Sequence, residues 1–195
     1  MLECLAHQLR YVMGEHTDCI VLRDELQALR EYFVIMKVRY EGRIRLSIQV
    51  SDEDAQLYIP KLLLQPVVEN AILHGIRPMG KGTLRISAVE KEGGEVLFEI
   101  SDNGCGIERE DLAALRQALK GERSREEMRS VGLFNVNQRI RLLYGAQYGL
   151  RIDSVPGDGT TVTVTLPPDG GGGKGTVYPA PRTGSIKTGV LDWKK

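Results

Sequence analysis

Short runs of alternating apolar and polar residues constrain the fold of this chain most, because such runs predict strands with one buried face. The runs cover residues 43–50, 83–89, 95–101, 147–155 and 160–166. Glu-Gly-Gly at 92–94 joins the second run to the third, and Pro-Gly-Asp-Gly at 156–159 joins the last two. Short connections rich in glycine are typical of β-hairpins. The sequence therefore predicts a sheet that is largely antiparallel.

Segments with the apolar spacing of helices separate these runs. They cover residues 2–13, 22–40, 60–75, 108–120 and 132–144. Pro60 suits a first helical turn, whereas Pro66 would bend the third helix or mark its true start. Helices that alternate with hairpins favour an α/β (α+β) two-layer sandwich. Its sheet would be mixed, mainly antiparallel, and covered by helices on one face.

Composition divides the chain into three parts. Residues 1–41 form a helical lead-in, residues 42–168 form one α/β domain, and residues 169–195 are a tail rich in glycine and proline that we expect to be flexible. The charged stretch 121–130 has almost no apolar anchors and is expected to be mobile. A length of 195 residues fits one domain with such appendages.

Charge and cysteine content exclude several function classes. The 26 basic and 26 acidic side chains cancel, so nucleic acid is not expected as a partner. The three cysteines form no CxxC pair, which argues against a zinc site or a disulfide framework. There is no signal peptide and no apolar run of the roughly 20 residues that span a bilayer. We expect a cytoplasmic location.

The first candidate site is the apolar segment LLLQPVVENAILHG, residues 62–75, which Glu69, Asn70 and His74 interrupt. Asn70 and His74 are four residues apart and share a helical face. An amide oxygen beside a carboxylate suits Mg²⁺, which completes its coordination with water and phosphate. An equally open interpretation is that Asn70 caps a loop and His74 ends the helix.

The second candidate site is EVLFEISDNGCGI, residues 95–107, where an apolar strand runs into Asp102, Gly104 and Gly106. A carboxylate at a strand end can accept a hydrogen bond from the exocyclic amine of adenine, whereas guanine has a carbonyl at that position. The two glycines would let the backbone approach a ring closely. Taken alone, an ordinary Asx turn explains this pattern better.

The third candidate site is SVGLFNVNQRIRLLYG, residues 130–145, where Gly132 opens an amphipathic helix. Backbone N–H groups at a helix start attract phosphate, and glycine permits close approach. Arg139, two turns further on, is within reach of the same anion. The alternative is a plain surface helix whose apolar residues face the core.

The order and spacing of four motifs carry more information than any one of them. ENAxxHG, DNGxGI, xGLxNVxxRIxxxYG and GDGTTVTVTLP together resemble the ATP-binding domains of the gyrase–Hsp90–histidine kinase–MutL (GHKL) superfamily. More closely, they resemble the histidine kinases related to the LytS autolysin sensor, and the likeness covers residues 2–167. LAHQLRYVM and DELQALREYFVIMKVRYEGRI resemble the segment that follows the phosphoacceptor motif in that group. The resemblance implies a Bergerat-type ATP-binding fold.

The resemblance also implies roles for individual residues. Asn70 would ligate the Mg²⁺ that bridges the ATP phosphates, Glu69 would be a base or supporting carboxylate, and Asp102 would read the adenine amine. Residues 107–131 would form a lid over the nucleotide. The other implied ATP-binding residues are His74, Gly104, Gly106, Ile107, Gly132, Leu133, Arg139 and Thr160.

Three departures from the family pattern stand out. Relatives often carry lysine where this chain has Leu73, and they have an earlier glycine where it has Ser130. The acceptor motif Asn-Pro-His-Phe-Leu-Phe-Asn is absent, and neither His7 nor His16 resembles an acceptor. We therefore expect the phosphorylated histidine to lie outside this chain.

These features imply a histidine protein kinase of a two-component system, with ATP and Mg²⁺ as cofactors. Expected partners are a response regulator with a LytTR or AraC-type output and a second copy of the kinase. The full sensor would be anchored in a bacterial membrane by segments upstream of this chain. Two alternatives remain open: a degenerate module that only binds a partner, and an anti-sigma-factor-type serine kinase or ATPase. Pro66, where gyrase-type relatives would have a base, argues against hydrolysis.

Overall fold

The computed structural model describes residues 19–91, 93–121 and 131–168, and every structural statement below concerns these residues. The expected helix at 2–13, most of the charged stretch 121–130 and the tail 169–195 lie outside them. The elements in chain order are β1 (Cys19–Val21), α2 (Leu22–Arg39), β2 (Ile44–Gln49), the 3₁₀ turn η1 (Asp54–Gln56), β3 (Tyr58–Pro60), α3 (Gln65–Asn70), the π-helical η2 (Ala71–Ile76), α4 (Arg77–Met79), β4 (Gly82–Glu90), β5 (Val96–Asp102), α5 (Arg109–Lys120), α6 (Val131–Tyr144), β6 (Gly149–Val155) and β7 (Gly159–Leu166).

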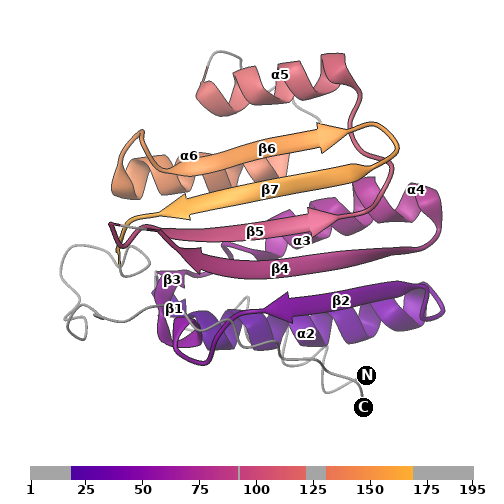
Figure 1. Ribbon diagram of the computed structural model, residues 1–195, viewed down its shortest axis with the longest axis horizontal. Helices are drawn as coiled ribbons and strands as arrows, with labels where there is room; N and C mark the ends of the chain where they lie inside the picture. Colours follow the sequence, from indigo (N-terminus) through magenta and orange to yellow (C-terminus); the bar gives the residue numbers. More distant parts are fainter. Residues whose placement is uncertain (1–18, 92, 122–130, 169–195) are drawn as a thin grey trace.

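Five strands form one mixed sheet in the order β2-β4-β5-β7-β6 (Figure 1). The pairing of β2 with β4 is parallel, and the other three pairings are antiparallel. This confirms the predicted α/β sandwich with a mixed, mainly antiparallel sheet. The short pair β1–β3 was not predicted, because three-residue strands leave too little pattern to detect.

The helices cover one face of the sheet. In β5 the buried residues alternate with more exposed ones, and Phe98 and Ile100 point into the core. In Figure 1 helices α2, α3 and α6 lie behind the sheet, and α5 lies beyond the β6 edge. Along β7, Val162 and Val164 are buried while the intervening threonines are partly exposed. One apolar and one polar face are what a two-layer sandwich requires.

Helix α2 belongs to the same hydrophobic core as the sheet. Its buried residues include Leu22, Leu29 and Phe33, which pack in one cluster with residues of every strand of the large sheet. The helix predicted over residues 22–40 is therefore present and ends at Arg39. It packs on the domain that follows it. Among the described residues, no helix has the length and apolar character needed to cross a membrane.

The helix predicted over residues 60–75 begins later and ends later than expected. Pro60 lies in β3, so a start at Pro60 is wrong, whereas Pro66 does mark the true start. The helical run begins at Gln65 and continues through the π-helical η2 to Met79. The reason for the late start is distant in sequence: the side chain of Glu25 accepts hydrogen bonds from the backbone at Leu64 and Gln65.

Asn137 ties α6 to its two neighbours. Its side chain is only 3% exposed. Its Nδ2 donates to the carbonyl of Leu119 at 2.7 Å, and its Oδ1 accepts from the backbone N–H of Leu150 at 2.8 Å. One side-chain amide therefore hydrogen-bonds a backbone carbonyl near the end of α5 and a backbone N–H near the start of β6.

We expect Asn137→Ala to lower the free energy of unfolding by about 1 to 3 kcal/mol, because it leaves the partly buried N–H of Leu150 without this partner. The carbonyl of Leu119 keeps a second donor, Arg141 Nη1 at 2.9 Å. Asn135 lies exposed on the same helix, so Asn135→Ala should change the free energy by less than about 0.5 kcal/mol. Urea unfolding of both variants measures the difference. Equal effects would mean that the bridge contributes nothing.

Candidate functional site

One pocket lies between the helical run 65–79 and strands β5, β6 and β7. The space inside it is about 500 Å³ when the part that opens to solvent is counted. The lining contains seven of the residues predicted from sequence: Asn70, His74, Asp102, Gly106, Ile107, Leu133 and Thr160. The rest of the lining is mostly apolar and includes Val67, Ile100, Leu115, Ile152 and Val162.

Asp102 places a carboxylate in this apolar pocket. It ends β5, where alternation turns its side chain to the helix-covered face, and it is 6% exposed. Burial raises the pKa of this carboxyl, and the backbone N–H groups of Gly104 and Thr160 partly oppose that shift. The Gly104 N–H donates to Oδ1 at 2.8 Å. A carboxylate has about four lone-pair sites, so capacity remains for a donor on a ligand.

Two glycines make room for this carboxylate. A Cβ on Gly75 would lie 2.5 Å from Asp102 Oδ1, and a Cβ on Gly104 would overlap the carbonyl of Gly75. The backbone N–H of Cys105 donates to the Gly75 carbonyl at 3.0 Å. Helix and loop therefore meet backbone to backbone around Asp102. Gly75 was not among the predicted site residues, although it closes the motif ENAILHG.

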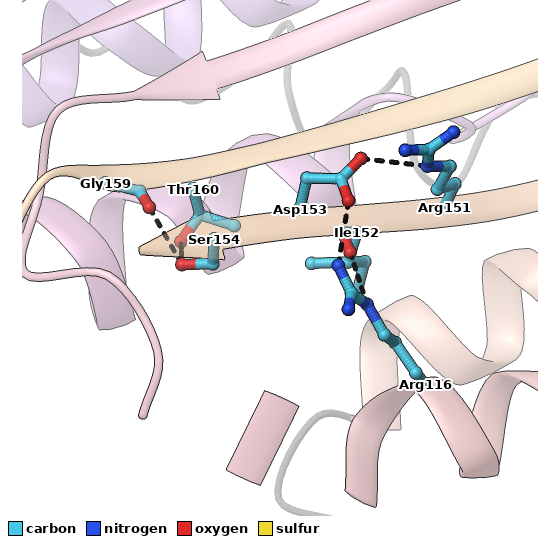
Figure 2. A network of polar contacts seen from close by, with 7 residues as sticks. All are labelled: Arg116, Arg151, Ile152, Asp153, Ser154, Gly159 and Thr160. Carbon is cyan, nitrogen blue, oxygen red and sulfur yellow. Dashed lines mark hydrogen bonds and ion pairs between the residues drawn. The ribbon is translucent and has the colours of Figure 1, made fainter. Parts of the chain in front are cut away.

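The opposite wall is fixed by a hydroxyl network (Figure 2). Ser154 Oγ donates to the carbonyl of Gly159 at 2.8 Å and lies 2.9 Å from Thr160 Oγ1. It also accepts from the backbone N–H of Ile107 at 2.9 Å. Gly106, with φ +69°, passes so close to Val155 that a Cβ would overlap its carbonyl. Sequence reasoning missed Ser154, since a lone serine in a strand carries no signal.

Helix α5 is held to β6 by a second contact in the same view (Figure 2). Arg116 Nε donates to the carbonyl of Ile152, and its Nη2 pairs with Asp153 at 2.8 Å. Arg151 contacts the other oxygen of Asp153 at 2.9 Å. These ion pairs are largely exposed and contribute little to stability. Their effect is positional, because the preceding residue, Leu115, lines the pocket.

The helical wall carries the polar end of the pocket. Asn70 and His74 both line it, and the His74 side chain is largely exposed. Glu69 does not line the pocket: its Oε1 accepts from Gln65 Nε2 at 2.9 Å. Burial, together with the negative charge of Glu69, raises the pKa of Tyr32 to about 12. Tyr32 of α2 and Glu69 are therefore close enough to interact.

The start of α6 lies beside Asn70. A Cβ on Gly132 would lie 3.8 Å from Asn70 Nδ2, and Leu133 lines the pocket. Arg139 is not in the lining. Its Nη2 instead donates to the carbonyl of Lys61 at 2.6 Å, which braces the loop before α3.

The oxygen donors of this site suit one kind of metal. In residues 19–91, 93–121 and 131–168, no group of three histidine, cysteine or acidic side chains could hold an ion. Asn70 offers an amide oxygen next to open pocket space, and the residue before it, Glu69, carries a carboxylate outside the lining. Such a sparse, all-oxygen set fits Mg²⁺ that takes most of its ligands from water and phosphate.

Comparison with known proteins agrees with this geometry. Residues 58–170 match the family model described as histidine kinase-, DNA gyrase B-, and HSP90-like ATPase, and residues 1–44 match the model of histidine kinases. Over 168 residues the chain is 34% identical to the sensor histidine kinase YesM of Bacillus subtilis, covering 86% of this chain and 27% of that protein. It is 33% identical to the sensor histidine kinase YpdA of Escherichia coli, covering 84% of this chain and 27% of that protein.

The fold also matches a solved structure. The histidine kinase domain from the Erythrobacter litoralis EL346 blue-light activated histidine kinase has a TM-score of 0.54 and 19% identity, covering 85% of this chain and 72% of that one. The chain belongs to the family of histidine kinase-, DNA gyrase B-, and HSP90-like ATPases. Within it, the chain is similar to the catalytic domains of sensor histidine kinases, and it spans about a quarter of the length of YesM and YpdA.

The raised pKa of Asp102 predicts a pH dependence. The folded protein holds this proton more tightly than the unfolded chain does. The contribution of the protonated Asp102 to the free energy of unfolding is therefore fully present below the unfolded pKa of about 3.9. This contribution is lost as the pH rises through the pKa of Asp102 in the folded protein. Without nucleotide, the stability of the wild type relative to Asp102→Asn should fall as the pH rises from about 4 towards 7. Urea unfolding at several pH values tests this, and a constant difference would refute it.

The different surroundings of Gly75 and Gly132 predict opposite effects on stability when each is replaced by alanine in the ligand-free protein. Gly75→Ala would push a methyl group into the Asp102 carboxylate and should cost about 1 to 3 kcal/mol. A Cβ on Gly132 would make only ordinary contacts, the nearest at 3.6 Å from Pro66. Gly132→Ala should therefore stabilise helix α6 by up to about 1 kcal/mol. Thermal unfolding of both variants gives the comparison, and destabilisation by both would contradict it.

Proposed function

We propose that this chain is the ATP-binding catalytic domain of a LytS-type two-component sensor histidine kinase. In this role it positions the γ-phosphoryl group of Mg·ATP for transfer to a histidine nitrogen. The observation that carries the proposal is the buried carboxylate of Asp102, framed by Gly75 and Gly104 at one end of an apolar pocket. A desolvated acceptor in an apolar slot selects for a ligand that brings its own donor.

Adenine is the ligand that we expect in this slot, because it is a flat ring with an exocyclic donor. Its flat ring would lie among Ile100, Ile152 and Val162, and its exocyclic amine would donate to Asp102. Guanine presents a carbonyl where adenine has the amine, so two acceptors would face each other. Thr160, fixed through Ser154, lies on the strand behind the base.

The phosphates would extend toward Asn70 and the start of α6. Asn70 would bind Mg²⁺ through its amide oxygen, with Glu69 as a supporting carboxylate or base. Gly132 and Leu133 would bring backbone N–H groups to the phosphates, since they open a helix beside Asn70. Bound Mg²⁺ would neutralise charge that develops on the phosphates.

The reaction is a phosphoryl transfer. A histidine nitrogen forms a bond to the γ-phosphorus while the bond to the bridging oxygen breaks, ADP leaves, and the histidine proton passes to a base. His7, His16 and His74 do not stand in an Asn-Pro-His-Phe sequence, so the acceptor is proposed to lie outside these 195 residues.

The wider assignment follows from the LytS-type resemblance and the similarity to YesM and YpdA. The proposed partner is a response regulator with a LytTR or AraC-type output. The full kinase is proposed to be a homodimer that segments beyond this chain anchor in a bacterial membrane.

Thermal unfolding with nucleotide tests the proposal. Mg·ATP at about 100-fold its dissociation constant should add about 2.7 kcal/mol to the stability and raise the midpoint by several degrees. GTP should give no shift, and Asp102→Asn should lose the shift with ATP. Gln138→Ala, exposed on α6 and away from the pocket lining, serves as the control and should keep the shift.

The possible results separate the open alternatives. An equal shift with ATP and GTP would refute adenine recognition by Asp102. No shift with any nucleotide would favour the module that only binds a partner. Labelled phosphate from ATP that appears on serine of an added protein, and not on histidine, would favour the serine kinase.

A further inference from the structure

A buried glutamate of α2 contacts the first residues of the helix that carries Asn70. Glu25 is 0% exposed. Its Oε1 accepts from the backbone N–H of Leu64 at 2.6 Å and from that of Gln65 at 3.3 Å. The contact joins residues 39 and 40 positions apart in sequence. It links α2 to the start of α3 through hydrogen bonds.

This contact completes the hydrogen bonding at the helix start. A helix leaves its first N–H groups without intrahelical partners. Leu64, at the N-cap position, has no side chain that could cap the helix. Pro66 has no N–H, and Val67 donates to the carbonyl of Leu64 at 3.0 Å. Glu25 therefore accepts the two N–H groups that remain.

A chain of side chains continues from this point to the pocket. Gln65, whose backbone Glu25 holds, donates from Nε2 to Glu69 Oε1 at 2.9 Å. Glu69 directly precedes Asn70, which lines the pocket. Tyr32 lies two turns along α2 from Glu25 and interacts with the charge of Glu69. Helix α2 thus interacts with α3 at two places, through Glu25 at the start of α3 and through Tyr32 near Glu69.

We propose that Glu25 is a positioning residue that sets the metal-binding end of the nucleotide site from α2. The proposal rests on the proposed function, since it assigns a source of control to that same site. A shift of α2 would move the carboxylate and with it the start of α3, so Asn70 and Glu69 would move. Asp102 lies on β5, in the middle of the sheet, and contacts the helical run at Gly75, ten residues beyond Gln65. Glu25 therefore governs the Mg²⁺-dependent part of nucleotide affinity and leaves base recognition unchanged.

A helix cap that only stabilises the fold is the competing explanation. If this explanation held, removing the carboxylate of Glu25 would lower the stability of the fold. The ratio of the ADP dissociation constant in EDTA to that in Mg²⁺ would stay unchanged. The discriminating quantity is therefore the dissociation constant of ADP measured in excess Mg²⁺ and again in EDTA. Isothermal titration calorimetry on the full 195-residue chain gives both values.

Four variants make the comparison. Glu25→Leu keeps the side-chain volume and removes the acceptor, while Glu25→Gln keeps an oxygen of the same reach. Met36→Ala destabilises the same core near the other end of α2 and has no such contact, so it is the matched control for stability. Gln65→Leu removes the contact with Glu69 and leaves the Glu25 carboxyl group in place.

For Glu25→Leu we expect the dissociation constant of Mg·ADP to rise about 10-fold or more, as for other groups that orient a metal ligand. The value in EDTA should change by less than about threefold, well below one tenfold step. Glu25→Gln and Met36→Ala should keep the wild-type ratio, and Gln65→Leu should lose part of it. If Glu25→Leu does not fold, the response of Gln65→Leu decides.

A folded Glu25→Leu or Gln65→Leu with the wild-type ratio would overturn the positioning role. An equal loss in Met36→Ala would also overturn it, since general destabilisation would then explain the effect. A wild type that binds ADP neither with nor without Mg²⁺ would remove the proposed function and this inference with it. A wild type that binds while the variants keep its ratio would remove only the inference.

Discussion

The close contact of two backbones around one carboxylate is the constraint on which the site depends. Gly75 from the helical layer and Gly104 from the loop after β5 meet without side chains between them, and Asp102 occupies the space that results. The sheet and the helices pack on either side of this contact. Burial of a charge is tolerated there because backbone N–H groups solvate it in place of water. The pocket therefore has its acceptor in place before any ligand arrives.

The wall around this contact is built from parts that are remote in sequence. Ser154 and Thr160 hold one side through hydroxyl groups, and Arg139 and Glu25 hold the loop and the first turn of α3 on the other. Ser154, Arg139 and Glu25 each bind a backbone group of another segment: the carbonyl of Gly159, the carbonyl of Lys61 and the N–H of Leu64. The contacts that shape the pocket therefore also supply hydrogen-bond partners to the backbone.

Local pattern was sufficient for the five strands of the large sheet, for its two hairpins and for the motif residues that end the strands. Alternation placed Asp102 at a strand end, and that prediction needed no distant information. It failed at the start of α3, because Glu25, which fixes that start, lies 39 residues away. Helical spacing could not predict the contact that Arg139 makes with the carbonyl of Lys61, because the spacing does not tell which neighbouring loop a long side chain reaches. Gly75 and Ser154 were missed because their roles depend on contacts with residues that are distant in sequence. Gly75 meets Asp102 and Gly104, and Ser154 binds the N–H of Ile107.

The π-helical turn at Ala71–Ile76 has a consequence for how this sequence can change in length. Hydrogen bonds of the i→i+5 type accommodate one more residue than an α-helix would in the same turn. That residue lies between Asn70, at the polar end of the pocket, and Gly75, against Asp102. A single-residue deletion here would let the segment relax into regular α-helix and would rotate one of these residues away from the pocket. Such a deletion would make the helix more regular, yet it would separate Asn70 from the contact of Gly75 with Asp102. The length of this segment is therefore set by two contacts that lie on either side of it.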